Sequence, residues 1–251
     1  MTIDSKVVDR TLVNDFWPAL SEAGFTRKGR TAWRRAERTL QVVTVRSFNS
    51  YLAAVLGSTT FSFGVSLGVF LDAIADHSRM TRFVRDRSTP REPDCHIRMF
   101  LTKGFDQSPA ALLGEYRQLP ATPEYGSAWI DRPDLWYVLP DGSNLGVCAN
   151  DARERILEDG IPWLARMSDE RAVIDVLQKR PDQFGERGVI LELIGGALGS
   201  PGRWQKIGSL AAVLGDRQLL AEAVAAMSEQ DYWNDWPEDL ETLRVALAGM
   251  S

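Results

Sequence analysis

Apolar and polar residues follow two different periods along this chain of 251 residues. Over residues 6–24 the apolar side chains recur every three to five positions, which predicts an amphipathic helix that ends at Gly24. Pro18 falls inside this span. Because proline removes a helical hydrogen bond, the pattern predicts a kink there or the start of a second helical segment.

From residue 31 onward the period changes to two, which is typical of strands. Residues 31–37 and 39–48 predict a strand pair joined by a tight turn near Arg38. The clearest strand is 58–71, where large apolar residues at odd positions alternate mainly with Ser and Gly. Its small-residue face predicts close packing against another part of the chain, such as the first helix. Further strands are predicted at residues 94–103, 135–139 and 145–148.

After residue 150 the strand signals stop and helical signals replace them. Asp151 is a candidate N-cap, with Glu154 three residues later as in a capping box, and Ser168 is a candidate cap of the next helix. Helices are predicted at residues 168–180, 189–198, 203–214, 217–227 and 238–248, and Gly215 and Asp216 separate two of them.

Strands followed by a run of helices predict the α+β class. We expect an N-terminal helix packed on an antiparallel sheet of about five strands, followed by an all-helical C-terminal region. Residues 1–150 would form the sheet domain. Residues 151–251 would form the helical region, either separate or packed on the sheet as one unit.

The composition is that of a globular protein, with 44% hydrophobic and 25% charged residues, which argues against disorder. Two cysteines are too few for the disulfide framework of a small secreted domain. The first residues lack the pattern of a signal peptide, and no apolar run approaches the roughly 18 residues of a membrane span. We therefore expect a cytoplasmic protein with no membrane partner.

Charge is distributed unevenly along the chain. Residues 1–150 contain 18 basic and 16 acidic side chains, whereas residues 151–251 contain 11 basic and 18 acidic ones. Such an asymmetry predicts surfaces that favour different partners.

Several motifs of the first two-thirds occur in the order seen in one bacterial family. Gly24 and Phe25 open a basic stretch, Trp33 follows with two arginines, and Ser66 is the position that departs from the pattern. The motifs lie at residues 24–30, 33–35, 40–43, 63–69 and 160–164. Over residues 7–167 the chain resembles the family filed as domain of unknown function 4304.

This resemblance brings no assigned activity and no catalytic residues. Relatives of this general kind are often small bacterial proteins encoded near toxins. The resemblance therefore implies an immunity-type role.

An arginine-rich segment is the strongest local charge feature. Arg30, Arg34 and Arg35 lie around Trp33, an arrangement that can follow a phosphate backbone while aromatic rings stack on bases. The same pattern also describes a solvated hairpin whose tryptophan faces the core. A whole-chain pI near 5.2 lacks the basic footprint of most nucleic-acid-binding proteins, so this reading is the alternative.

Other chemistry-bearing patterns are sparse. Asp94, Cys95 and His96 are consecutive, but neighbouring strand residues point to opposite faces, and the only other histidine is His77. No nucleophile elbow, Walker loop or dinucleotide fingerprint occurs. We therefore expect no metal, no cofactor and no catalytic residue, while an enzyme whose site assembles from distant residues stays an open alternative.

The segment from 229 to 241 contains six acidic residues and no Lys or Arg, with three aromatic residues among them. Aromatic rings surrounded by carboxylates are typical of a hot spot for a basic partner, although such rings also pack helix junctions. The leading hypothesis is a non-catalytic bacterial protein that binds another protein, in the manner of an immunity factor that neutralises a basic toxin. The expected partner-binding residues are Trp233, Asp235, Trp236, Glu238 and Asp239.

Overall fold

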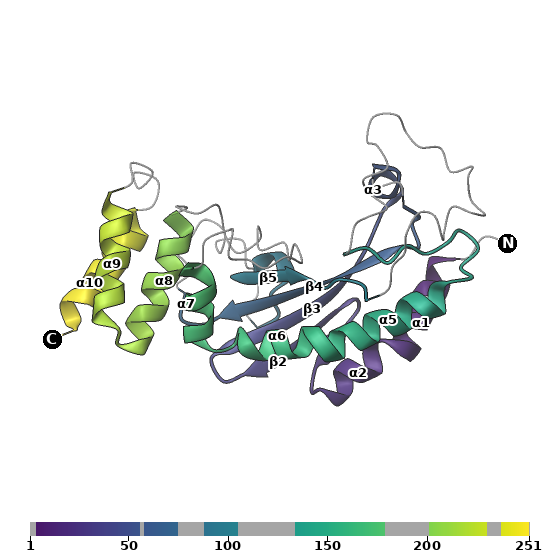
Figure 1. The fold of residues 1–251 in the computed structure, drawn as a ribbon, viewed down its shortest axis with the longest axis horizontal. Helices are drawn as coiled ribbons and strands as arrows, with labels where there is room; N and C mark the ends of the chain where they lie inside the picture. Colours follow the sequence, from purple (N-terminus) through teal and green to yellow (C-terminus); the bar gives the residue numbers. More distant parts are fainter. Residues whose placement is uncertain are drawn as a thin grey trace. The chain divides into compact units, whose positions relative to one another are not determined.

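The structure is a computed structural model that describes residues 4–55, 58–74, 88–104, 134–178, 201–229 and 237–250. Within these ranges it contains an N-terminal helical segment, a five-stranded antiparallel sheet and a helical C-terminal region (Figure 1). The α+β class predicted from the sequence is confirmed.

The sheet is a simple meander in which each strand pairs with the next one along the chain. Glu37 has a φ of 38° in the turn between the second and third strands, so the predicted hairpin and its tight turn are confirmed. The strands are β1 (Thr26–Lys28), β2 (Thr31–Ala36), β3 (Thr39–Ser47), β4 (Phe63–Leu71) and β5 (Ile97–Phe100), in the order β1-β2-β3-β4-β5.

Strand β4 is buried along its whole length. Atoms of neighbouring segments cover its small-residue face. A Cβ on Gly64 would lie 3.0 Å from the carbonyl oxygen of Asp134, and one on Gly68 would lie 2.6 Å from the Sγ of Cys95. The close packing predicted over this face is therefore present. Its source at these two glycines is not the first helix, because the nearest atoms belong to residues 46, 92, 95 and 134.

The N-terminal helix is interrupted where proline predicts it. The first helix, α1 (Ser5–Asp15), begins after Asp4, whose carboxylate accepts a hydrogen bond from the Lys6 amide at 3.1 Å. The second, α2 (Trp17–Glu22), has Pro18 in its first turn, where a backbone N–H would have no acceptor within the helix. Helix α1 packs on α5 (Leu145–Arg155), and α2 contacts β1.

Residues 145–148 are helical, not a strand as predicted from a four-residue pattern. They form the start of α5, which continues through a π-helical turn, η4 (Ile156–Gly160), into α6 (Ile161–Arg166). Buried Leu145, Cys148, Ala149 and Ala152 recur at spacings of three and four, a helical period that a shorter window does not resolve. Of residues 135–139, Trp136 forms a single antiparallel bridge to Phe63.

The helix N-caps differ in part from the prediction. Asp151 lies inside α5 instead of capping a helix. Asp169, rather than Ser168, caps α7 (Glu170–Gln178), because its carboxylate accepts a hydrogen bond from the Ala172 amide at 2.8 Å. The Ser168 hydroxyl instead donates to the carbonyl oxygen of Leu164 at 2.9 Å.

The C-terminal helices α8 (Pro201–Leu214), α9 (Arg217–Ser228) and α10 (Pro237–Gly249) agree with the predicted spans. Gly215, with φ of 71°, and Asp216, which caps α9, separate the first two as expected. The helix predicted at residues 189–198 lies outside the described residues. The three helices share a core formed by Ala211, Leu220, Met227, Leu240 and Leu243.

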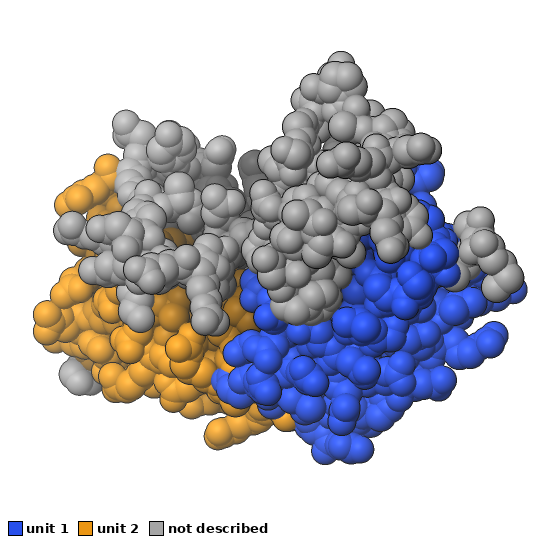
Figure 2. All heavy atoms as spheres, turned by 45° about the vertical axis from the view of Figure 1, so that its right-hand side comes forward, with its two compact units in different colours: residues 1–32, 43–66, 100–162 blue, residues 33–42, 67–99, 163–251 orange. Residues whose placement is uncertain are grey.

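The remaining short elements are α3 (Ser50–Val55) and a 3-10 turn, η2 (Glu92–Asp94). The chain divides into two compact units, coloured separately in Figure 2. Unit 1 comprises residues 1–32, 43–66 and 100–162, and unit 2 comprises residues 33–42, 67–99 and 163–251. This grouping cuts across the boundary expected at residue 150, because strands β2 to β5 contribute residues to both units.

Candidate functional site

Helix α10 presents an exposed face that combines carboxylates with apolar surface. Four residues on one side of the helix, Glu238, Glu241, Thr242 and Val245, line an open hollow of about 570 Å³ together with Pro237. We call these four residues the α10 face. All four are exposed, and Val245 keeps 62% of its surface accessible. An exposed branched side chain that follows two carboxylates along one side of a helix is a surface suited to protein contact.

The structure places one of the five predicted partner-binding residues on this face. Glu238 is exposed at the start of α10, whereas Asp239 is only 3% exposed. Successive helical residues point about 100° apart, so Asp239 lies on the inner side with Leu240 and Leu243. Asp239 therefore does not offer its carboxylate to a partner as expected. Trp233, Asp235 and Trp236 lie outside the described residues.

Three residues of the α10 face, Glu241, Thr242 and Val245, are not among the residues predicted to bind a partner. Glu241 is the last residue of the acidic segment 229–241, and Val245 lies beyond that segment. The helical spacing from Glu238 to Glu241, Thr242 and Val245 was the signal that could have grouped them. To recognise these four residues as one surface requires the register of the helix, which composition alone does not give.

The arginines of the nucleic-acid hypothesis interact with neighbouring protein groups. In unit 1, Arg30 forms an ion pair with Asp9 at 2.6 Å. In unit 2, Arg34 donates to the side-chain oxygen of Gln41 at 2.7 Å, and Arg35 pairs with Asp72 at 3.0 Å.

The tryptophan between these arginines also has a structural role. Trp33 donates its indole N–H to the carbonyl oxygen of Pro90 at 2.7 Å and packs against the cluster of Leu40, Val42, Phe70 and Cys95. Its ring is thus committed to packing rather than to stacking on a base. The solvated-hairpin reading of this segment fits these contacts better than the nucleic-acid reading.

Asp94, Cys95 and His96 each make separate structural contacts. Asp94 accepts a hydrogen bond from the Arg91 amide at 2.9 Å, and the Cys95 thiol lies 3.6 Å from the carbonyl oxygen of Arg91. The Nδ1 of His96 accepts a hydrogen bond from the Leu71 amide at 2.9 Å. Across the described ranges, no group of three or more His, Cys, Asp or Glu side chains could hold a metal ion.

Cys95 lacks the surroundings of a reactive thiol. Burial, followed by the charge of Glu92, raises its pKa well above the ordinary value. The side chain is 6% exposed and fills the space left by Gly68. Because the thiolate is the nucleophilic form, these surroundings keep the sulfur unreactive.

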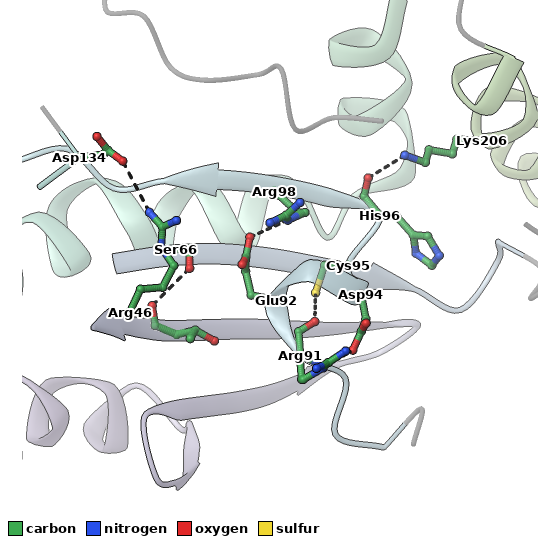
Figure 3. Close-up of polar contacts among 11 residues, drawn as sticks. Arg46, Ser66, Arg91, Glu92, Asp94, Cys95, His96, Arg98, Asp134 and Lys206 are labelled. Atoms are coloured by element: carbon green, nitrogen blue, oxygen red, sulfur yellow. Dashed lines mark hydrogen bonds and ion pairs between the residues drawn. The ribbon is translucent and has the colours of Figure 1, made fainter. Parts of the chain in front are cut away.

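Unit 2 contains a polar cluster near β4 and β5 that the sequence does not predict (Figure 3). Glu92, 2% exposed, accepts a hydrogen bond from the Nε of Arg98 at 2.6 Å. The Nζ of Lys206 donates to the carbonyl oxygen of His96 at 3.0 Å. The aromatic ring of Phe70 lies 4.6 Å from the His96 ring, between centroids.

The ammonium of Lys206 in this cluster has an altered pKa. Burial of its ammonium, followed by the nearby positive charge of Arg98, lowers its pKa to about 8. The residue is half-buried, and α8 positions it against the chain just before β5. The hydrogen bond to the carbonyl oxygen of His96 ties α8 to the chain before β5, whereas the positive charge of Arg98 opposes protonation of the amine.

In unit 1, Asp151 joins two segments that are distant in sequence. Its carboxylate accepts hydrogen bonds from the indole N–H of Trp136 at 2.8 Å and from the Gly104 amide at 3.0 Å. The Trp136 ring is fully buried and stacks on Phe63, with ring centroids 5.6 Å apart. Asp151 therefore satisfies a buried donor and has a structural role.

Comparison of this chain with protein-family models, curated proteins and solved structures finds no match. The resemblance to domain of unknown function 4304 stays a prediction that rests on the order of its motifs. Each helix in the described ranges is too short or too polar to cross a membrane.

Proposed function

We propose that this protein is a non-catalytic binding protein that takes a basic protein partner on the α10 face. The observation that carries the proposal is the exposure of Glu238, Glu241 and Val245 on one side of one helix. Carboxylates at such a surface accelerate encounter with a positively charged protein, and the valine supplies apolar area to bury once contact is made.

Two further observations support binding rather than other functions. The acidic excess of residues 151–251, with 18 acidic and 11 basic side chains, favours a basic partner. The three arginines expected to contact nucleic acid pair with Asp9, Gln41 and Asp72 instead. Phosphate binding would have to compete with these contacts.

The resemblance described above extends the proposal to an immunity-type role, in which the partner is a basic toxin met in the cytoplasm. Neutralisation by binding requires a tight complex and no chemistry on the partner. A small acidic protein whose contacts serve packing is suited to that task.

Site-specific photo-crosslinking in the cells that encode the protein tests this proposal. A photoreactive amino acid replaces Thr242 on the α10 face, and a control replaces Glu154, which is exposed on α5. The expected result is a basic protein crosslinked from position 242 and not from position 154. The E238K/E241K pair should remove that crosslink because it reverses the charge that attracts the partner.

Equal crosslinking from both positions, or a crosslinked protein that is not basic, contradicts the proposal. A matched variant, E22K/E154K, makes the same change of net charge at exposed positions away from α10. It should leave the crosslink at position 242 intact. Loss of the crosslink in this variant as well would attribute the effect to net charge and not to the α10 face.

A further inference from the structure

The side of α10 that carries the α10 face continues to the end of the helix, and its two halves differ in chemistry. Glu238 and Glu241 lie in the first two turns of α10, whereas Val245, Ala248 and Gly249 lie in the last two. All five residues are exposed and fall at spacings of three, four, three and one along the helix. They form a stripe on one side of a helix that is about 20 Å long.

The C-terminal half of this stripe is small and unobstructed. A Cβ built on Gly249 would meet no atom within 4 Å, and Ala248 next to it ends at its Cβ. Small side chains let another backbone approach closely, as they do where helices cross at short distance. Val245 stands beside this low surface as its largest apolar group, 62% exposed.

We propose that the partner element that occupies the α10 face is a basic amphipathic helix, an inference that rests on the proposed function. Such a helix carries Lys or Arg at two positions about one turn apart, which meet Glu238 and Glu241. Apolar residues on the same side, further along the helix, cover Val245, Ala248 and Gly249. This is helix-on-helix recognition with charges that fix the register.

Charge complementarity favours this occupant over a second copy of the chain. Another α10 would bring two more carboxylates to the pair and no basic residue on the matching stripe. The one arginine of α10, Arg244, donates to the hydroxyl of Ser228 at 3.2 Å, on α9. Pairing of two copies through this face therefore places four carboxylates in one interface, which opposes association.

Two synthetic peptides of equal composition test the inference with the full-length protein. Both contain six Lys, six Leu and four Ala. In one, two Lys one turn apart precede the six Leu along one side of a helix, and the other four Lys lie on the opposite side. In the other peptide, Lys and Leu are spread around the helix. Titration is followed by the fluorescence anisotropy of a label on each peptide. The segregated peptide should bind about tenfold more tightly, because it alone can pair charges and bury apolar area together.

Matched variants locate the contact. Val245→Ser should weaken binding of the segregated peptide about tenfold, whereas Val213→Ser, at an exposed valine of α8, should not change it. Gly249→Leu fills the low surface and should weaken binding to a similar degree. Because a side chain at Gly249 meets no other atom within 4 Å, this variant is expected to fold.

Three results would overturn the inference. If the two peptides bind equally and Val245→Ser has no effect, the α10 face attracts charge but does not bind a helix. The proposed function is still supported in that case if E238K/E241K removes the crosslink. If neither peptide binds and no crosslink forms at position 242, both this inference and the proposed function are contradicted. If sedimentation shows that the protein is a dimer and that Val245→Ser dissociates it, the stripe binds a second copy of this chain instead.

Discussion

The ammonium of Lys206 on α8 donates a hydrogen bond to the backbone carbonyl oxygen of His96, 3.0 Å away and 110 residues earlier in the chain. This contact ties a C-terminal helix of unit 2 to the residue that precedes β5. Burial of this ammonium, followed by the positive charge of Arg98, lowers the pKa of the lysine to about 8.

The Lys206 contact predicts a particular dependence of stability on pH. The pKa is about 8 in the folded protein and 10.5 for an ordinary lysine. Between these values the unfolded chain binds a proton that the folded chain does not, so stability contributed by this group rises with pH from about 8 to about 10.5. Below pH 8 both states are protonated, and the cost of the buried ammonium is fully present.

Lys206→Met removes this titration. Urea unfolding at pH 7 and at pH 10 should show that the free-energy difference between wild type and variant changes by about 1–3 kcal/mol across the window. Lys206→Met removes the hydrogen bond to His96 together with the cost of burying the ammonium, so the informative quantity is how the free-energy difference changes with pH. Lys28→Met, on the exposed strand β1, is the control. Parallel pH profiles for wild type and Lys206→Met would contradict the buried, shifted ammonium.

Gly68→Ala should destabilise the protein by about 1–3 kcal/mol, because overpacking a filled core forces side chains from their preferred positions. The added Cβ would lie 2.6 Å from the Sγ and 2.7 Å from the Cβ of Cys95. The matched change Gly146→Ala, in α5, places its Cβ in open space and should raise stability by about 0.5–1 kcal/mol. Thermal or urea unfolding of the two variants measures the contrast. Equal effects of the two substitutions would exclude the close packing of β4 against Cys95.

Asp151→Ala should cost about 1–3 kcal/mol, because it leaves the buried indole N–H of Trp136 without its acceptor. Glu154→Ala, one turn along α5 and exposed, should change stability by less than about 0.5 kcal/mol. The free energy of unfolding in urea, read by tryptophan fluorescence, compares them. A neutral Asp151→Ala would show that the carboxylate is not the partner of Trp136.

The two cysteines should resist a thiol reagent in the folded protein. Burial raises the pKa of Cys95, and Cys148 is fully buried. At pH 8 a chromogenic disulfide should therefore label neither sulfur rapidly in the native state and both after addition of denaturant. Fast labelling of one equivalent before unfolding would mean that a thiol is accessible. Repeating the assay with Cys95→Ser would identify which one.

Local sequence patterns predict much of the fold where the pattern is long. The alternation over residues 31–48 and the glycine–aspartate pair at 215–216 identify β2, β3 and the junction of α8 and α9 correctly. The four residues 145–148 match a strand pattern, because so short an apolar run does not distinguish a repeat of two residues from a repeat of 3.6. The buried positions at 148, 149 and 152 reveal the helix only when its whole length is considered.

The candidate sites were less accessible to sequence reasoning, because they depend on tertiary contacts. No local pattern relates Lys206 to His96 or Asp151 to Trp136 and Gly104. On α10 the acidic run was visible, yet the run alone does not tell that Glu238 faces outward and Asp239 inward. Helix register, fixed by packing of Leu240 and Leu243, decides between them.

The association rate of this protein with its crosslinked partner tests the central claim most directly. Stopped-flow mixing at low salt compares wild type, E238K/E241K and E22K/E154K. We predict that E238K/E241K slows association at least about tenfold, that E22K/E154K has a much smaller effect, and that rising ionic strength removes the difference. Equal association rates for wild type and E238K/E241K at low salt would contradict binding of a basic partner through the α10 face.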